Sequence, residues 1–196
     1  MDRIAADVEL PFAPSAVILV EGASDRGALE ALARRRGRDL ASERVAVVSM
    51  GGSKNISKFL ERFGPIGLDL RVAGLCDEAE ERDYRRAVEL AGLGVAPTRD
   101  DLELLGFFVC VPDLEGELIR ALGADAVEGV IESLGQTGRF RTFLKQPEWR
   151  ERTRDDQLHR FLGVGAGRKI EAAPLLVDAL DLDRVPRPLD AVLAQV

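Results

Sequence analysis

Four short apolar runs alternate with segments of helical periodicity in the N-terminal part of the chain. The runs cover residues 16–20, 44–50, 70–77 and 107–111. Continuous apolar runs of this length are typical of strands that are covered on both faces. Between them, apolar side chains recur at helical spacing, as Ile56, Phe59, Leu60 and Phe63 do. This alternation predicts an α/β fold, in which a parallel sheet of about four strands is flanked by helices on both faces.

The pattern changes after Pro112, beyond which helical periodicity predominates. Helices are expected in "DLEGELIRALG", in "ADAVEGVIESLG" and over about 168–180, and the proline-containing end of the chain is expected to be partly extended with a short terminal helix. Ser24 and Thr98 precede two of the predicted helices and are candidate N-caps. The sequence predicts one domain over residues 1–196, with an α/β core over about 14–123 and a helical extension over 124–196.

Composition places the chain among ordinary folded proteins. It has 196 residues, of which 46% are hydrophobic and 31% charged. No apolar run approaches the roughly 18 residues that span a bilayer, and the first 15 residues lack the apolar region of a signal peptide, so we expect no membrane contact and a cytoplasmic location. Cys76 and Cys110 lie in apolar runs, which argues against a disulfide framework or a thiolate zinc site. His159 is the one histidine, which excludes a histidine-based metal cluster.

Charge is unevenly distributed along the chain. The net charge is −7, which argues against a nonspecific polyanion binder. Residues 137–170 nevertheless contain nine Arg or Lys against four acids. This basic segment is either a solvated helical surface or a basic face opposite an acidic site.

Acidic residues follow three of the four predicted strands. Glu21 and Asp25 follow the first strand, Asp77 ends the third, and Glu115 comes soon after the fourth. Ligands of open parallel sheets bind at the carboxyl ends of the strands. Carboxylates gathered there repel one another unless a cation neutralises them, and Mg²⁺ or a similar hard ion prefers oxygen ligands. The alternative is that each acid caps the helix after it.

Four segments together resemble a known family. They are "VILVEGASD", "GLCDEAEE", "CVPDLEGELIRALG" and "GRKIEAAPLLVDAL". In this order they resemble the TOPRIM domain of OLD-family (overcoming lysogenization defect) nucleases, which are coupled to an ATPase. The resemblance extends over nearly the whole chain. It implies a TOPRIM, Rossmann-like parallel sheet and a site that binds Mg²⁺ or Mn²⁺, with a two-metal arrangement.

The resemblance also implies roles for individual residues. Metal ligands are implied at Glu21, Asp25, Asp77 and Glu115. Catalytic roles are implied for Glu21, as an acid or base, and for Lys169, which stabilises phosphate charge. Contacts to a phosphate or a nucleic acid are expected from the turn after the second strand and from the residue before Lys169, namely Gly51, Gly52, Ser53, Lys54 and Arg168.

The chain departs from the family pattern at one metal position. Where the family has Asp-x-Asp, this chain has Asp77, Glu78 and Ala79, so the second aspartate is missing. Glu80 or Glu81 could reach inward from the first helical turn instead, and Glu80 is taken as the fifth candidate ligand.

These residues predict metal-dependent cleavage or nicking of DNA by an OLD-like TOPRIM endonuclease. The first alternative is a degenerate TOPRIM module that binds nucleic acid or a partner ATPase without cutting. The second is an RNA-processing or nucleotidyl-transfer TOPRIM enzyme, and RNA is therefore kept beside DNA as a candidate partner. A separate ATPase is a candidate partner. No ATP site is expected in this chain, because "GVGAGRKI" fails the spacing of a phosphate-binding loop.

Two aromatic residues are assigned structural roles. Nothing in "ERDYRR" marks Tyr84, the single tyrosine, as a nucleophile. Trp149 lies in the basic segment and is either a packing anchor or a residue that stacks on a base, and the anchor is favoured.

Overall fold

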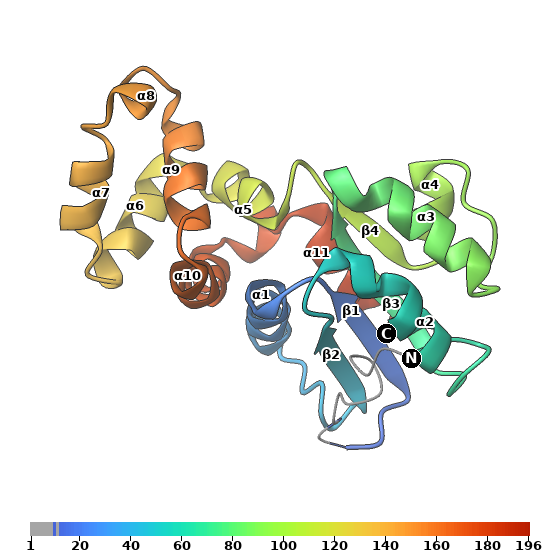
Figure 1. Ribbon diagram of the computed structural model, residues 1–196. Coiled ribbons are helices and arrows are strands. Elements are labelled where there is room, and N and C mark those ends of the chain that lie inside the picture. Colours follow the sequence, from blue (N-terminus) through green and yellow to red (C-terminus); the bar gives the residue numbers. More distant parts are fainter. Residues whose placement is uncertain (1–9, 11) are drawn as a thin grey trace.

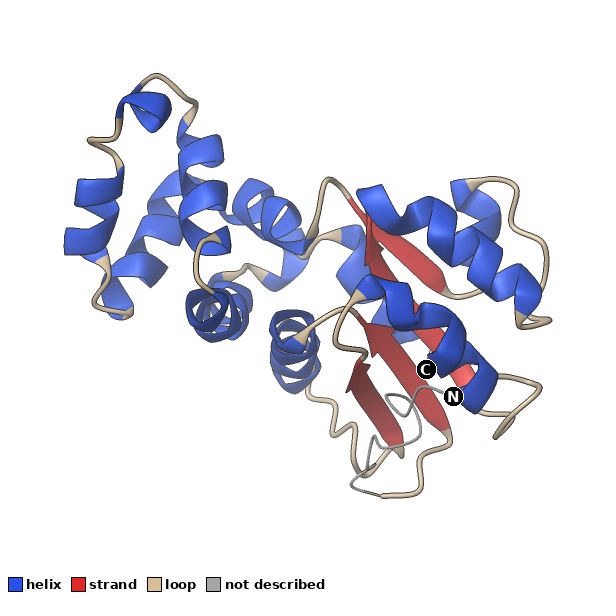
Figure 2. Ribbon diagram, viewed as in Figure 1, coloured by secondary structure: helices blue, strands red, loops and turns tan. Residues whose placement is uncertain are grey.

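The protein is built around one four-stranded sheet, shown in Figure 2. The computed structural model describes residue 10 and residues 12–196. The strands are β1 (Ala16–Val20), β2 (Val45–Ser49), β3 (Arg71–Asp77) and β4 (Phe107–Cys110), and they lie in the order β2-β1-β3-β4. All three pairings are parallel. The predicted parallel sheet of four strands is confirmed, and each strand falls within its apolar run.

Helices make up most of the remaining described chain. Before β4 they are α1 (Ala23–Arg35), α2 (Ile56–Phe63), α3 (Glu81–Leu90) and α4 (Arg99–Leu104). After β4 they are α5 (Leu114–Leu122), α6 (Ala124–Ser133), α7 (Thr137–Phe143), α8 (Pro147–Arg150), α9 (Arg154–Gly163), α10 (Ala166–Ala179) and α11 (Arg187–Ala194). Three short 3₁₀ turns complete the set, η1 (Ser53–Asn55), η2 (Glu78–Glu80) and η3 (Leu182–Arg184). No described helix has the length and apolar character of a membrane-spanning segment.

Both faces of the sheet are buried, as the unbroken apolar strands require. In β1, Ile18 and Val20 belong to one core, which includes residues of α1, α10 and α11. Val17 and Leu19 belong to the other core, which includes residues of α2, α3 and α4. Figure 1 shows α2, α3 and α4 together on one side of the sheet. Alternate side chains of one strand therefore hold two helical layers in place.

The segment after residue 124 has two parts. Helices α6–α9 form a helical arm that projects away from the sheet (Figure 1). Helix α10 then returns to pack along α1, where Gly27 faces Pro174, and Arg35 donates a hydrogen bond to the carbonyl oxygen of Val177 at 2.7 Å. Helix α11 contacts β3 and β4. The predicted helical extension over 124–196 therefore contains an arm and, in α10 and α11, a cover of the sheet itself.

Two predictions about helix ends have different outcomes. Thr98 is the N-cap of α4, and its side chain accepts a hydrogen bond from the backbone of Asp101, as predicted. The prediction that Ser24 caps α1 was wrong, because the N-cap is Gly22 and Ser24 is buried inside the first turn. Asp25 accepts a hydrogen bond from the Gly22 amide at 2.7 Å, so a residue of the first turn supplies the cap instead.

Candidate metal centre

The strand order creates a crevice between the carboxyl ends of β1 and β3. From β1 the chain passes to β2 on one side, and from β2 it crosses over to β3 on the other side of β1. Such a switch in direction leaves the carboxyl ends of the two central strands uncovered by a connection, and open α/β sheets bind ligands there. Glu21 directly follows β1 and Asp77 is the last residue of β3. Two of the predicted ligands therefore flank this crevice.

Three carboxylates converge at this point. Oxygen atoms of Glu21, Asp77 and Glu80 all lie within 4.8 Å of one another. Glu80 belongs to η2, the 3₁₀ turn that follows β3 without an intervening loop. A single divalent cation can contact oxygen atoms that are this close, and carboxylates are ligands that Mg²⁺ and Mn²⁺ accept.

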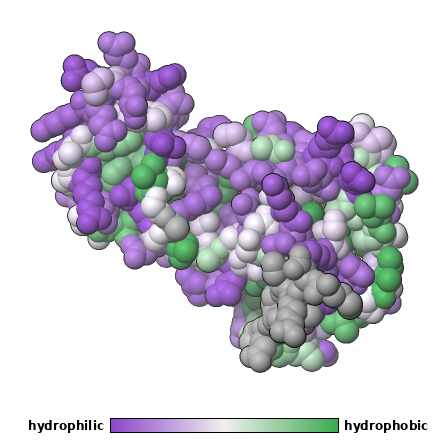
Figure 3. Space-filling model, viewed as in Figure 1, coloured by the Kyte–Doolittle hydropathy of each residue, from purple (hydrophilic) through white to green (hydrophobic). Residues whose placement is uncertain are grey.

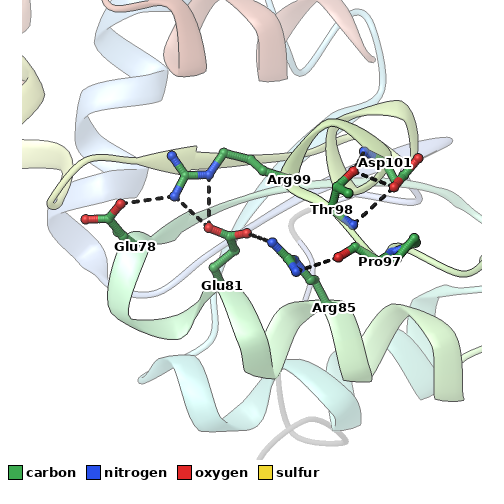
Figure 4. A network of polar contacts seen from close by, with 7 residues as sticks. All are labelled: Glu78, Glu81, Arg85, Pro97, Thr98, Arg99 and Asp101. Atoms are coloured by element: carbon green, nitrogen blue, oxygen red, sulfur yellow. Dashed lines mark hydrogen bonds and ion pairs between the residues drawn. The ribbon is translucent and has the colours of Figure 1, made fainter.

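Glu80 lies with Glu21 and Asp77, whereas Glu81 is held by two arginines, as Figure 4 shows. Glu81 accepts hydrogen bonds from Arg85 and from Arg99, the latter at 2.6 and 2.9 Å. Arg99 also binds Glu78 at 3.1 Å. The acids on either side of Glu80 are thus both held by Arg99. Of the two candidates for the place of the missing aspartate, Glu80 is therefore the one that lies with Glu21 and Asp77.

Asp25 and Glu115 lie beside the three converging carboxylates and are more deeply buried. Glu115, in the first turn of α5, is 4% exposed, and its Oε1 atom is buried without a hydrogen-bond partner. Burial raises the pKa of Glu115 and of Asp25, and in both cases the charge of Lys169 opposes the rise. An unpartnered buried carboxylate oxygen is unusual in a folded protein and fits a ligand atom for a cation.

Lys169 completes the site from a distant part of the chain. It lies in the first turn of α10, and its Nζ atom is 2.9 Å from Oε2 of Glu115. Although burial opposes the charged form, the contact with Glu115 and the charges of Asp25 and Asp77 hold the pKa of Lys169 above its usual range. The packing of α10 on α1 brings this ammonium group to the acids. The role in stabilising phosphate charge that the resemblance implies for Lys169 stays a prediction.

The electrostatics of the cluster favour a bound cation. Burial, followed by the charges of neighbouring carboxylates, raises the pKa of Asp77 to about 7; the neighbours are Asp113, Asp25 and Glu21. Burial also raises the pKa of Glu21, helped by the charges of Asp25 and Glu80. Carboxylates resist ionisation in such a group, and a divalent cation relieves the repulsion. The residues present therefore fit a Mg²⁺ or Mn²⁺ site.

The predicted phosphate-contacting residues fall into two groups. Gly51 and Gly52 form the turn after β2 with φ angles of 69° and 130°, and the Gly52 amide donates to the carbonyl oxygen of Glu21 at 3.1 Å. This turn, which needs glycine at positive φ, is adjacent to the metal centre, and Ser53 begins η1 directly after it. Lys54 lines a groove with residues of α2 and α3.

Arg168 lies apart from the acids. Its Nη1 atom donates to the carbonyl oxygen atoms of Phe161 and Val164 at the end of α9, and its guanidinium lies over the Phe161 ring, 4.0 Å from the centroid. The structure thus brings together Glu21, Asp25, Asp77, Glu80, Glu115 and Lys169, and places Arg168 against α9.

A histidine contact near the site was missed in the sequence. Nε2 of His159 lies 2.7 Å from Oδ2 of Asp113, the N-cap of α5. His159 is half-buried, and no local pattern in the sequence shows that α9 places it next to a strand-end acid. The other structural assignments agree with expectation. Tyr84 is fully buried and donates to the carbonyl oxygen of Leu75, and Trp149 stacks on Phe143 as a packing anchor.

A four-stranded parallel sheet flanked by helices, with carboxylates gathered at its switch point, is the architecture of a TOPRIM-like α/β domain. Residues 12–78 match the family described as "Overcoming lysogenization defect protein-like, TOPRIM domain". This matched range contains Glu21, Asp25 and Asp77. The predicted resemblance is therefore confirmed: residues 12–78 are similar to the TOPRIM domain of OLD-like proteins.

Solved structures extend the similarity over nearly the whole chain. The C-terminal region of the Xanthomonas campestris pv. campestris OLD protein is 25% identical, with a TM-score of 0.72, and the match covers 94% of this chain and 95% of that one. The C-terminal region of the Burkholderia pseudomallei OLD protein is 23% identical, with a TM-score of 0.66 and coverage of 93% and 96%. The latter supports the fold alone. No curated protein sequence matches the chain.

Proposed function

We propose that the protein cleaves or nicks DNA by metal-dependent hydrolysis of phosphodiester bonds. The observation that carries this proposal is the convergence of Glu21, Asp77 and Glu80 within 4.8 Å, at the switch point of an OLD-like TOPRIM fold. Lys169, brought to the same place by α10, strengthens it, because a cation beside a carboxylate cluster is suited to a negatively charged substrate.

Mg²⁺ or Mn²⁺ is the proposed cofactor. Glu21, Asp77 and Glu80 would hold one ion, and Asp25 and Glu115 offer the carboxylates for a second. Divalent ions bound there would lower the pKa of an attacking water and stabilise charge on the phosphate. Oxygen ligands favour these ions over softer metals such as zinc.

The residues of the chain have separate tasks in this proposal. Lys169 holds a positive charge close to Glu115, where it stabilises the charge that develops on the phosphate in the transition state. Glu21 is only partly buried and accepts or returns a proton at the substrate. The glycine turn at Gly51 and Gly52 lets the backbone approach the phosphate beside Glu21.

DNA is the proposed substrate, and an ATPase is the proposed partner. Both follow from the likeness to OLD proteins, whose solved C-terminal regions are parts of longer chains. We place this activity in the cytoplasm, where DNA and divalent ions are available. The ATPase is either a separate protein or another part of the same polypeptide.

A plasmid-nicking assay tests the proposal. Supercoiled plasmid is incubated with the purified protein and Mn²⁺ or Mg²⁺, with EDTA as the blank. Wild type is expected to nick, while Glu21→Gln and Asp77→Asn are expected to lose about 100-fold or more of the activity, as removal of groups that act on the transition state does. Glu30→Gln is the matched control, because Glu30 is an exposed acid of α1 that pairs with Arg26 away from the cluster.

The outcomes separate the proposal from its alternatives. Background nicking by wild type in every metal overturns the nuclease assignment for this chain. If wild type also fails to bind Mn²⁺ at millimolar concentration, a degenerate TOPRIM module that binds nucleic acid or a partner is favoured, for which the missing second aspartate at Ala79 is the supporting observation. A parallel incubation with RNA distinguishes the RNA-processing alternative, which predicts faster cleavage of RNA than of DNA.

A further inference from the structure

The helical arm carries arginine and lysine side chains that lack acidic partners. Nine cations lie within residues 137–170. Among the described residues, two of these nine form ion pairs with carboxylates, Arg154 with Glu128 and Lys169 with Glu115, and the other seven form none. By contrast, Arg26 in α1, Arg36 at the C-cap of α1 and Arg85 in α3 are all paired with carboxylates.

Two of the unpaired arginines meet in a groove. A groove of about 350 Å³ runs between α7 and α9 and ends at the first turn of α10. It is lined by Arg139 and Arg168, with Thr142, Phe143, Gln146 and Phe161 among its other walls. The charge of Arg139 is close enough to depress the pKa of Arg168, behind the larger effect of burial. Two guanidinium groups thus share one groove whose lining contains no carboxylate.

Arg168 is held in a fixed position, whereas Arg139 is exposed and weakly held. Its Nη1 atom is held by the carbonyl oxygen atoms of Phe161 and Val164, and its Nε atom is buried without a partner. Arg139 is exposed and makes only a 3.4 Å hydrogen bond to Gln136. Like charges at close range are unfavourable unless an anion lies between them. The groove is therefore complementary to a phosphate group, for which planar guanidinium groups are well suited.

Aromatic walls add a second feature to the groove. Phe143 is half-buried and Phe161 is buried, and their ring centroids are 5.6 Å apart. Positively charged grooves with aromatic walls bind single-stranded nucleic acid, because bases stack on the rings while phosphates contact the cations. The groove volume of about 350 Å³ is near the low end for ligand pockets, which suits a single nucleotide unit. Figure 3 shows apolar surface between the hydrophilic edges of the arm.

The groove is linked to the metal centre through α10. Arg168 and Lys169 are consecutive residues of its first turn, and Lys169 reaches Glu115 while Arg168 lines the groove. We propose that the groove between α7 and α9 is a subsite for an unpaired strand of DNA, in which Arg139 and Arg168 bind a backbone phosphate and Phe143 contacts a base. The subsite holds the strand next to the first turn of α10, from which Lys169 meets the reacting phosphate. This inference rests on the proposed function for its substrate class.

Binding measured in EDTA tests the subsite without cleavage or metal. The probe is a fluorescein-labelled dT oligonucleotide of about 20 residues, with a duplex of the same length beside it, and fluorescence anisotropy is followed with the full chain. Arg139→Gln is expected to weaken single-strand binding by about threefold to tenfold and to reduce the slope of log K against log salt by about 0.7, as the loss of one phosphate contact does. Arg141→Gln is the matched control, because Arg141 is also exposed on α7 but does not line the groove.

A second variant tests the aromatic wall. Phe143→Leu keeps an apolar side chain and removes the ring, so it is expected to weaken binding of the single strand more than that of the duplex. Equal losses for Arg139→Gln and Arg141→Gln, or no binding by wild type at low salt, overturn the subsite. Equal losses on single strand and duplex for Phe143→Leu overturn the contact to a base. Because no metal is present, these results are independent of whether the plasmid is nicked.

Discussion

The ammonium group of Lys169 lies 2.9 Å from a carboxylate oxygen of Glu115 and joins α10 to α5 at the metal centre. The Glu115 side chain is 5% exposed, and its second oxygen is buried without a hydrogen-bond partner. Lys169 therefore compensates for the burial of this charge. Removing one partner of a buried pair leaves an uncompensated charge, which costs more than the pair itself contributes.

Lys169→Met is expected to destabilise the protein by about 1–3 kcal/mol, below the cost for a fully buried pair because the Lys169 side chain is 34% exposed. Urea denaturation near pH 8 with EDTA measures this change. The double variant Lys169→Met, Glu115→Gln is the control, and it is expected to regain at least half of the loss because no charge is left unpaired. Additive losses in the double variant would contradict the pairing.

The pKa of Asp77, raised to about 7, predicts how stability depends on pH without divalent ions. The folded state holds this proton more tightly than the unfolded chain, in which the pKa is near 3.8. The stability that this proton on Asp77 gives to the folded state is therefore fully present below pH 3.8 and is lost as the pH rises through 7. Thermal unfolding in EDTA is expected to show a Tm that falls by a few degrees between about pH 5 and pH 8. In Asp77→Asn the fall is expected to be smaller, and an identical profile would contradict the assignment.

Divalent ions are expected to restore the folding stability that is lost as the pH rises through 7. An ion that binds only the folded state stabilises it by about 2.7 kcal/mol when its concentration is 100 times Kd. Mn²⁺ should therefore raise the Tm of wild type near pH 8, while Asp77→Asn and Glu21→Gln should respond much less. Glu30→Gln, the exposed acid outside the cluster, should respond as wild type does. Calorimetry on the same variants checks whether heat of Mn²⁺ binding disappears with the Tm shift.

The strand-end residues of this metal centre were predictable from the sequence, because the ends of buried strands can be recognised in the apolar pattern. The buried strands appear as apolar runs, and parallel strands bring their carboxyl ends to one edge, so Glu21 and Asp77 were expected to meet. Lys169 was found through the family resemblance, because nothing in the local pattern shows that α10 packs on α1. The range that matches the TOPRIM family, residues 12–78, contains Glu21 and Asp77 but not Lys169.

The remaining features depend on contacts between distant parts of the chain. The choice between Glu80 and Glu81 is made by Arg99, which lies on a different helix and binds Glu81 and Glu78. The contact between His159 and Asp113 joins α9 to α5 and leaves no local signal. Ser24 was mistaken for a cap because propensity favours serine there, whereas Asp25 bonds back to the Gly22 amide.

The hydrogen bond between His159 and Asp113 predicts a second dependence on pH. This bond raises the pKa of His159 and, against the effect of burial, lowers the pKa of Asp113. The charged pair is therefore stabilising between about pH 4 and pH 6.5, weakens as Asp113 is protonated below that range and weakens as His159 loses its proton above it. His159→Leu is expected to lower stability more at about pH 5.5 than at about pH 9. Chemical denaturation at both pH values measures this, and equal losses would contradict the charged pair.

Arg99 is expected to set the affinity of the centre for Mn²⁺ without touching the ion. It holds Glu78 and Glu81, the acids on either side of Glu80, and so keeps η2 in the conformation that turns Glu80 toward Asp77. Residues that orient ligands in this way typically change metal affinity by about tenfold or more when replaced. Arg99→Gln is therefore expected to weaken Mn²⁺ binding by about tenfold, as measured by the electron paramagnetic resonance signal of free Mn²⁺.

Arg85→Gln is the matched control for Arg99→Gln, because Arg85 also binds Glu81 but does not contact Glu78. It leaves Arg99 in place, so Mn²⁺ affinity is expected to change little even though one ion pair is lost. Arg99→Lys is expected to recover part of the affinity, since an ammonium group can bind one of the two acids but lacks the planar fork that reaches both. If Arg99→Gln and Arg85→Gln bound Mn²⁺ equally well, the selection of Glu80 would have to come from the backbone of η2 alone.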